Sequence, residues 1–306
     1  MNINKIYLQN RAREDFNKAR SRATISQLLF SLTPERQRLL SLEDVRSLLR
    51  PTGESYKGMQ AVSIEKIVGS EGRYNDFTKA FLPKSDFIRG RWESIDRAHL
   101  SDVILPAVKL YEIGGVYFVR DGNHRVSVAR MQGVEAIDAE VIELDTRIPL
   151  TPGMTVTDLK KVVIEYEKQQ VFGDTKLDTI IPPEEILFSE PGRYVEMLRH
   201  IQGHKYFLNQ KKTREIPFLE AASSWYNTLY KPIVRIIEQE NIIGRFPDRT
   251  MSDLYMWIIK HWDWLKQKYG NNFSLHRAVM DYSEKYGQSL WQQVLKFIKK
   301  LLFRNR

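Results

Sequence analysis

The loop at residues 121–125 combines groups that could bind an anion. It consists of Asp121, Gly122, Asn123, His124 and Arg125. The apolar and aromatic run 116–119 before it is typical of a buried strand, and apolar residues recur at helical spacing after it. At such a strand–turn–helix junction, free backbone N–H groups point at the turn, and an arginine can donate two hydrogen bonds to a phosphate. The loop therefore predicts a phosphate site, with an ordinary β-turn-α connection as the alternative.

Charged residues elsewhere could complete a site for phosphoryl transfer, which requires positioning and neutralisation of charge. The carboxylate of Asp121 could help to hold a hydrated Mg²⁺ ion beside the phosphates, or it could cap the following helix. The stretch that we expect to approach the loop contains Arg73, Arg89, Arg91 and Arg97. One or two of these arginines could contact phosphates, and the others are expected to be solvated charges.

Two further groups of residues are better explained as ordinary structure. His200 and His204 stand four residues apart, which can bring two imidazoles to one metal ion, but no third ligand is identifiable. We therefore predict no metal site. A group of aromatic residues on one predicted helix could stack on nucleic-acid bases or fill a core, and we favour the core. This group is Trp257, Trp262, Trp264 and Tyr269.

The elements that must position the loop belong to a predicted α/β core at residues 60–147. The core opens with a strand at 61–63 and a turn at 67–70, and a short strand is expected at 105–110. A pair of glycines makes a turn into the strand that precedes the loop. The alternating pattern at 136–142 predicts the strand that closes the core.

Helical patterns flank this core on both sides. Residues 1–59 predict a helical hairpin, and residues 148–306 predict a larger helical domain. Capping boxes should start helices at Thr155 and Thr250, and a long helix is expected to kink at Pro232. The chain is thus predicted to be an α+β protein, with a small mixed-sheet core between an N-terminal helical hairpin and a larger C-terminal helical region.

The composition is that of a globular protein from a reducing compartment. Of the 306 residues, 42% are hydrophobic and 28% are charged, and cysteine is absent. The absence of cysteine excludes disulfides, thiolate nucleophiles and cysteine-bound zinc or iron–sulfur clusters. The N-terminal residues hold no apolar signal core, and no apolar run is long enough to span a membrane, so we expect no transmembrane segment. These features favour a cytoplasmic location.

The net charge of +9 is unevenly distributed along the chain. Residues 61–150 hold 12 basic and 14 acidic side chains, so the predicted core is not the basic part. The basic flanks could contact nucleic acid. A basic amphipathic helix from Ser289 onward could lie on a membrane surface, meet nucleic acid or another protein, or pack its apolar stripe on the helical domain.

The order of elements around the loop resembles the ParB/sulfiredoxin superfamily, whose members share a Gly-x-x-Arg phosphate loop between a strand and a helix. The resemblance covers about residues 61–147, with Gly122 and Arg125 as the loop residues. The flanks are similar to a bacterial family that carries this module between helical segments, including the stretch 246–257. The resemblance implies a mixed-sheet fold and nucleotide-phosphate binding by the loop 121–125.

The loop excludes some activities of the superfamily and favours others. Sulfiredoxins carry a cysteine two residues before the loop arginine, where this chain has Asn123, so sulfinic-acid repair is excluded. Chromosome-partitioning clamps carry Glu, Arg and Arg where this chain has Asn123, His124 and Ser127. Free-serine kinases use an Asp-Gly-His-His-Arg loop, close to the one here, and a Glu after the opening strand as general base. Glu71 lies in a comparable place, so the resemblance implies a catalytic base there, with a solvated loop glutamate as the alternative.

Two functions from different classes follow. The first is a nucleotide-phosphate-binding protein that uses ATP or another nucleotide with Mg²⁺, as an ATP- or ADP-dependent small-molecule phosphotransferase or an NTPase. Arg73, Arg89 and Arg91 would then be additional phosphate contacts. The second is a non-catalytic transcriptional regulator or DNA-binding protein that uses the module and its basic flanks.

Overall fold

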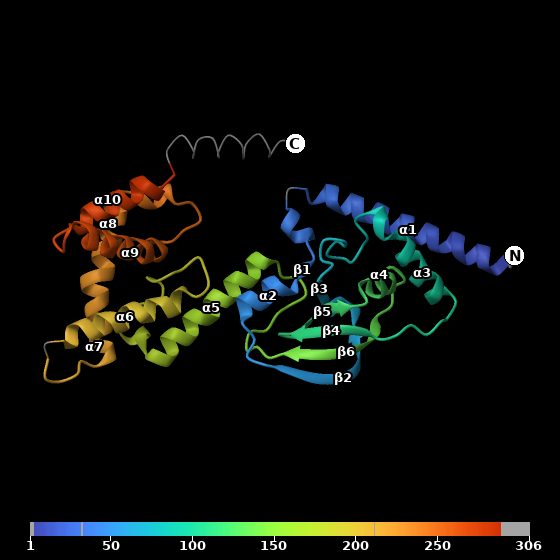
Figure 1. Cartoon of the computed structure of the whole chain (residues 1–306), viewed down its shortest axis with the longest axis horizontal. Helices are drawn as coiled ribbons and strands as arrows, with labels where there is room; N and C mark the ends of the chain where they lie inside the picture. Colours follow the sequence, from blue (N-terminus) through green and yellow to red (C-terminus); the bar gives the residue numbers. More distant parts are fainter. Residues whose placement is uncertain (1–2, 32, 211, 289–306) are drawn as a thin grey trace. The chain divides into compact units, whose positions relative to one another are not determined.

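The computed structural model describes residues 3–31, 33–210 and 212–288. The chain divides between Lys160 and Lys161 into two compact units. The first unit holds a β-sheet with helices, and the second is helical (Figure 1). The predicted α+β class is confirmed.

The sheet of the first unit has six strands and mixed topology. They are β1 (Leu40–Ser41), β2 (Glu54–Ser63), β3 (Ile67–Ser70), β4 (Val108–Ile113), β5 (Val116–Asp121) and β6 (Ala136–Leu144). Their spatial order is β1-β3-β5-β4-β6-β2. β3 runs parallel to both β1 and β5, whereas β4 is antiparallel to β5 and parallel to β6, and β6 is antiparallel to β2.

The predicted strand–turn–helix unit is present, as β5 followed by α4 (Asn123–Met131). β4 and β5 form a hairpin through Gly114 and Gly115, whose φ angles of 61° and 91° are in the left-handed region that glycine adopts readily. Phe118 and Val119 of β5 are fully buried. The hairpin therefore anchors the loop in the core of the unit.

The turn predicted at residues 67–70 is instead strand β3, which is buried throughout its length. Glycine and serine favour turns in isolation, but Gly69 is needed here for close packing. A Cβ atom on Gly69 would lie 2.3 Å from the ring of Phe118 and 2.5 Å from the carbonyl oxygen of Leu40. Tertiary packing between β1 and β5 thus overrides the local turn signal.

The N-terminal segment differs from the predicted hairpin. It forms one long helix, α1 (Ile3–Leu29), then a 3₁₀ turn (Pro34–Gln37), β1 and the short helix α2 (Leu42–Leu49). Since β1 pairs with β3, and β2 begins at Glu54, the first 59 residues share the sheet of the core and do not form a separate domain.

Helices α1, α3 (Arg89–Leu100) and α4 supply one side of a shared hydrophobic core with the sheet. Phe16 of α1 packs edge-on against Trp92 of α3, with ring centroids 5.5 Å apart. Trp92 Nε1 donates to Ser127 Oγ on α4 at 2.8 Å, and that hydroxyl donates to the carbonyl oxygen of Phe81 at 2.6 Å. These contacts fix the position of α4, and hence of the loop before it.

The second unit is helical, as predicted. Its helices are α5 (Val156–Thr175), which begins before the division, α6 (Arg193–Asn209), α7 (Phe218–Trp225), α8 (Lys231–Gln239), α9 (Met251–Tyr269) and α10 (Leu275–Tyr286). Both predicted capping boxes are present, with Thr155 facing Asp158 and Thr250 facing Asp253. The helix predicted from Ser289 lies outside the described residues.

The expected kink at Pro232 takes the form of a π-helical turn, Tyr226–Tyr230, between α7 and α8. Proline has no N–H group to donate to the carbonyl four residues earlier, so the regular α-helical ladder is interrupted there. The widened turn accommodates this interruption just before the proline. In the residues that the structure describes, no helix is long and apolar enough to cross a membrane.

Candidate anion-binding site

The loop 121–125 lies at the carboxyl end of β5, beside the carboxyl end of β3. The two strands are parallel neighbours, so both leave the sheet at the same edge. After β3, the N–H group of Glu71 donates to the carbonyl oxygen of Val119 at 3.0 Å. The N–H group of Arg73 donates to Ser70 Oγ at 3.2 Å. These bonds bring Glu71 and Arg73 to the loop.

A cavity of about 360 Å³ opens at this edge, and we call it the α4 cavity. It is lined by Glu71, Gly72, Arg73, Arg91, Ile95, Arg120, Asp121, Gly122, Asn123, His124 and Arg125. All five predicted loop residues, the predicted base and two of the predicted arginines therefore meet in one place. Arg120 was missed from the sequence, although its position directly before the loop could have indicated it.

Arg89 does not line the α4 cavity, contrary to the prediction. Its guanidinium pairs with Asp86 at 2.7 Å and lies over the ring of Phe16, 4.3 Å from the centroid. It also donates to Asn17 at 2.9 Å. Arg89 therefore joins α3 to α1. Arg97, on the same helix, does not line the cavity either.

Gly122 gives α4 an open N-terminus. Its φ of 105° lies in the left-handed region, and a Cβ atom there would lie 2.7 Å from Val108 Cγ1 and 3.0 Å from Arg125 Nε. Among the described residues, no side chain caps this end of the nine-residue helix. The free N–H groups of its first turn, and the positive end of its dipole, are therefore available at the cavity.

Two buried polar atoms lie at the same end of α4 without a hydrogen-bond partner in the described structure. They are Asn123 Oδ1 and His124 Nδ1, on side chains of residues that are 7% and 6% exposed. Burial, and after it the positive charges of Arg91 and Arg73, lower the pKa of His124 to about 4. The imidazole is therefore neutral at pH 7 and can form a hydrogen bond without carrying charge.

Arg125 is held by the protein itself. Its side chain is 13% exposed and pairs with Asp121 at 2.5 Å. The other end of the guanidinium donates to the carbonyl oxygens of Pro106 and of Ala107, the latter at 2.9 Å. Arg125 therefore lines the α4 cavity but mainly fixes the loop to the segment before β4. Asp121 is the ion-pair partner of this arginine and does not cap α4.

The remaining arginines of the cavity are more exposed than Arg125. Arg73 pairs with Asp76 at 3.0 Å, and Arg120 lies over the ring of Tyr111, 5.6 Å from its centroid. Arg91 is exposed, and no carboxylate pairs with it within residues 3–31, 33–210 and 212–288. Arg91 thus offers an incoming ligand an exposed guanidinium that is not paired with a carboxylate.

The other predicted groups are not part of this site. His204 Nε2 bonds to Ser224 Oγ at 3.0 Å, and His200 Nδ1 lies 3.5 Å from Tyr255 Oη. Over the described part of the chain, no cluster of three or more His, Asp or Glu side chains could hold a metal ion.

The aromatic group of α9 is only partly core. Trp257 and Trp262 pack against the hydrophobic core of the second unit, as predicted. Trp264 and Tyr269 are 47% and 61% exposed, so the prediction is wrong for these two residues. They lie towards the end of the helix, beyond its densely buried first half.

No protein-family model matches this chain, and no curated protein or solved structure matches it either. The resemblance to the ParB/sulfiredoxin superfamily therefore stays a prediction from the sequence.

Proposed function

We propose that the α4 cavity binds a phosphate-bearing small molecule, with a nucleotide as the first candidate. One observation carries the proposal: the open N-terminus of α4 lies at a cavity whose walls include four arginines together with Asn123 and His124, each of which has an unpartnered buried polar atom. Unpaired buried polar atoms cost free energy, and a ligand could pair them if the two side chains turn towards the cavity when it binds.

The charges and donors fit a phosphate ester. Backbone N–H groups at a helix N-terminus bind phosphate oxygens, and Arg91 adds an accessible guanidinium. Asn123 Oδ1 accepts hydrogen bonds, so the ligand should also carry a donor such as a hydroxyl or amino group. Nucleotides and phosphorylated small alcohols combine both features.

Turnover would require a base, and Glu71 is the candidate. It is an exposed carboxylate on the rim of the α4 cavity, and its backbone is bonded to β5. Phosphoryl transfer from a Mg²⁺–nucleotide to an alcohol would use this carboxylate to orient the hydroxyl. Glu71→Gln should then abolish turnover and leave nucleotide binding unchanged. Unchanged turnover in the variant would exclude this role.

Thermal denaturation in the presence of ligands tests binding directly. Purified protein is heated with ATP, ADP, inorganic phosphate or adenosine, each with and without Mg²⁺. A ligand at about 100 times its Kd stabilises the folded state by about 2.7 kcal/mol. We expect stabilisation by the phosphate-bearing compounds and none by adenosine. The proposal fails if no phosphate-bearing compound raises the melting temperature at millimolar concentration.

Two variants on α3 test whether phosphate-bearing ligands bind in the α4 cavity. Arg91→Gln removes the accessible guanidinium and should weaken phosphate binding about tenfold or more, as expected for a charge-assisted hydrogen bond. Arg97→Gln removes the same charge from the same helix but outside the cavity, so it should bind like the wild type.

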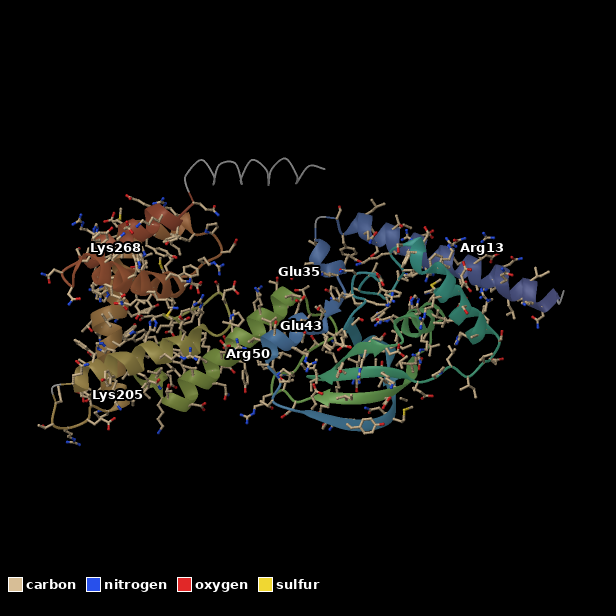
Figure 2. The ribbon with its side chains drawn as sticks, in the orientation of Figure 1. Arg13, Glu35, Glu43, Arg50, Lys205 and Lys268 are labelled. Atoms are coloured by element: carbon tan, nitrogen blue, oxygen red, sulfur yellow. The ribbon has the colours of Figure 1, made fainter. Side chains whose placement is uncertain are left out.

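Salt dependence separates this function from DNA binding by the basic flanks. Basic side chains such as Arg13 on α1 and Lys268 on α9 are distributed over both units (Figure 2). Binding through 6–10 phosphate contacts would weaken by about 10³–10⁵ between 50 and 200 mM salt. A single phosphate pocket should be much less sensitive, and duplex DNA should not displace a bound nucleotide.

A further inference from the structure

We propose that the helical unit contains a second ligand site, which takes a planar aromatic molecule with an anionic group. The site is a pocket of about 510 Å³, which we call the α6 pocket. Its walls are Arg199, His200, Gly203, His204, Phe207, Trp225, Leu229, Tyr255, Ile259, Lys260, Trp262, Asp263 and Lys266. All of them belong to the second unit, and the inference does not depend on the function proposed for the α4 cavity.

Aromatic side chains from three segments form the apolar surface of the α6 pocket. Trp225 and Tyr255 are fully buried, with ring centroids 5.6 Å apart and rings nearly perpendicular. Trp225 Nε1 donates to Tyr255 Oη at 2.7 Å, so both rings are fixed. Trp262 adds a third wall, and Phe207 at the end of α6 is 68% exposed. A pocket of this size with aromatic walls is typical of small-molecule sites.

A glycine in the middle of α6 leaves the pocket open. Gly203 lies between His200 and His204, and nothing lies within 4 Å of the position that a Cβ atom would take. Glycine in a helix interior costs about 1 kcal/mol relative to alanine, and no close backbone contact requires it here. Gly203 therefore makes α6 less stable than alanine would, at a position where a larger side chain would enter the α6 pocket.

The π-helical turn supplies a second indication of function. Leu229, which lines the pocket, belongs to this turn, and Trp225 directly precedes it. Single π-helical turns inside α-helices occur frequently at functional sites. Here the turn places two wall residues opposite α6 and α9, so the interruption before Pro232 shapes the same pocket that Gly203 keeps open.

The charges at the rim favour an anion. Lys260 pairs with Glu196, and Lys266 pairs with Asp263 at 2.7 Å. Arg199 is exposed, and it has no carboxylate partner within the described ranges. Burial lowers the pKa values of His200 and His204, so both imidazoles are neutral at pH 7 and act as hydrogen-bonding groups. The rim thus offers one uncompensated cation above an aromatic interior.

Two fluorescent probes that differ only in their charged group test this inference. 8-Anilinonaphthalene-1-sulfonate is an aromatic anion with a planar naphthalene ring system, and N-phenyl-1-naphthylamine is the same skeleton without the sulfonate. We expect the full-length protein to bind the sulfonate saturably at one site per chain. Energy transfer from tryptophan to the probe should accompany binding, because Trp225 and Trp262 form the walls.

A matched pair of glycine variants locates the bound probe. Gly203→Leu fills the α6 pocket and should weaken binding of both probes at least tenfold. Gly173→Leu makes the same change in α5, where a Cβ atom also meets nothing within 4 Å, but Gly173 does not line the α6 pocket, so this variant should bind both probes like the wild type. The proposed site in the α6 pocket would be excluded if Gly203→Leu bound the probes with wild-type affinity, or if probe binding to the wild type did not saturate.

A second pair of variants tests the charge preference without altering the helix interior. Arg199→Gln should weaken the sulfonate about tenfold and leave the neutral probe unchanged, as expected for the loss of one charge-assisted bond. Arg235→Gln, at an exposed position of α8 outside the pocket, is the control and should change neither affinity. An equal affinity of Arg199→Gln and wild type for the sulfonate would contradict the anionic ligand class.

Discussion

The α4 cavity and the α6 pocket, the two ligand sites proposed above, are lined by opposite kinds of groups. The α4 cavity is built from backbone N–H groups, arginines and buried amide and imidazole groups at the edge of a sheet. The α6 pocket is built from tryptophan, tyrosine and phenylalanine side chains between helices. In the α4 cavity, a ligand would be stabilised by hydrogen bonds and charge pairing with polar groups that are already in place. In the α6 pocket, a ligand would be stabilised by burial of its aromatic surface against apolar side chains.

Gly122 lines the α4 cavity and Gly203 lines the α6 pocket, but the two glycines differ in their surroundings. Gly122 has a φ of 105° and close neighbours, so the fold of the loop requires it. Gly203 has helical backbone angles and empty space around it, so the fold does not require it. The packing of the fold thus accounts for Gly122 but not for Gly203, nor for Gly173 in α5, and only Gly203 lines the α6 pocket. The following experiments test this contrast.

Substitution of Gly122 should have the largest effect on stability. In Gly122→Ala, the new Cβ would lie 2.7 Å from Val108 Cγ1 in a backbone conformation that alanine adopts at a cost. Strain and overpacking together should destabilise the first unit by about 4 kcal/mol. Urea denaturation followed by circular dichroism measures the change. Wild-type stability in this variant would mean that the loop can relax without its left-handed residue.

Acidification should weaken the first unit through His124. The native pKa is lowered to about 4 by burial and by Arg91 and Arg73, with Asp76 acting in the opposite direction, whereas the unfolded imidazole has its usual pKa of about 6.5. Between these values the unfolded chain binds a proton that the native state does not. The free energy of unfolding should therefore fall as the pH drops from 6.5 to 4, by up to about 3 kcal/mol.

The variant His124→Gln isolates this contribution from those of other titrating groups. Its unfolding free energy should depend less on pH than that of the wild type over the same interval, as measured by urea denaturation at pH 7.5 and 4.5. An identical pH dependence would show that His124 is not buried as a neutral group. Saturating phosphate should raise the pKa of His124 in the wild type, which NMR titration of the imidazole can detect.

Of the four arginines that line the α4 cavity, Arg125 should contribute to the stability of the fold, whereas Arg91 should not. Arg125→Ala removes the ion pair with Asp121 and the bonds to two carbonyl groups, and should cost about 2 kcal/mol. Arg91→Ala removes an exposed side chain and should change the stability by less than about 0.5 kcal/mol. Thermal denaturation of the two variants without ligand gives both values. Equal stabilities of the two variants would contradict the assignment of a structural role to Arg125 and not to Arg91.

The sequence was sufficient to predict features that depend on neighbouring residues. The run 116–119, Gly122 and the apolar positions after it specify a strand, a turn and a helix within about fifteen residues, and the structure contains them. The capping boxes at Thr155 and Thr250 are equally local. Local patterns of this kind fix the backbone without help from distant parts of the chain.

Features that depend on distant contacts could not be predicted. The strand character of residues 67–70 follows from pairing with β1 and β5, and the role of Arg125 follows from carbonyl groups 18 and 19 residues earlier. Arg89 belongs to the stretch expected to approach the loop, but its side chain contacts Asp86 and Phe16, whereas that of Arg91 lines the α4 cavity. The α6 pocket needs helices that are far apart in the chain, and Gly203 between two histidines was its only local sign.

The smallest change in the free energy of unfolding is expected for Gly203→Ala. Whether this change is stabilising or destabilising tests the contrast between Gly122 and Gly203. Gly203→Ala adds a methyl group in open space and removes a residue of low helix propensity, so it should stabilise the second unit by about 0.5–1 kcal/mol. The measurement is urea denaturation monitored by tryptophan fluorescence. Gly173→Ala provides the control, since it should be stabilising by a similar amount without affecting the pocket. If Gly203→Ala instead destabilised the unit, the fold would require this glycine as it does Gly122, and the argument that it is retained for a ligand would lose its basis.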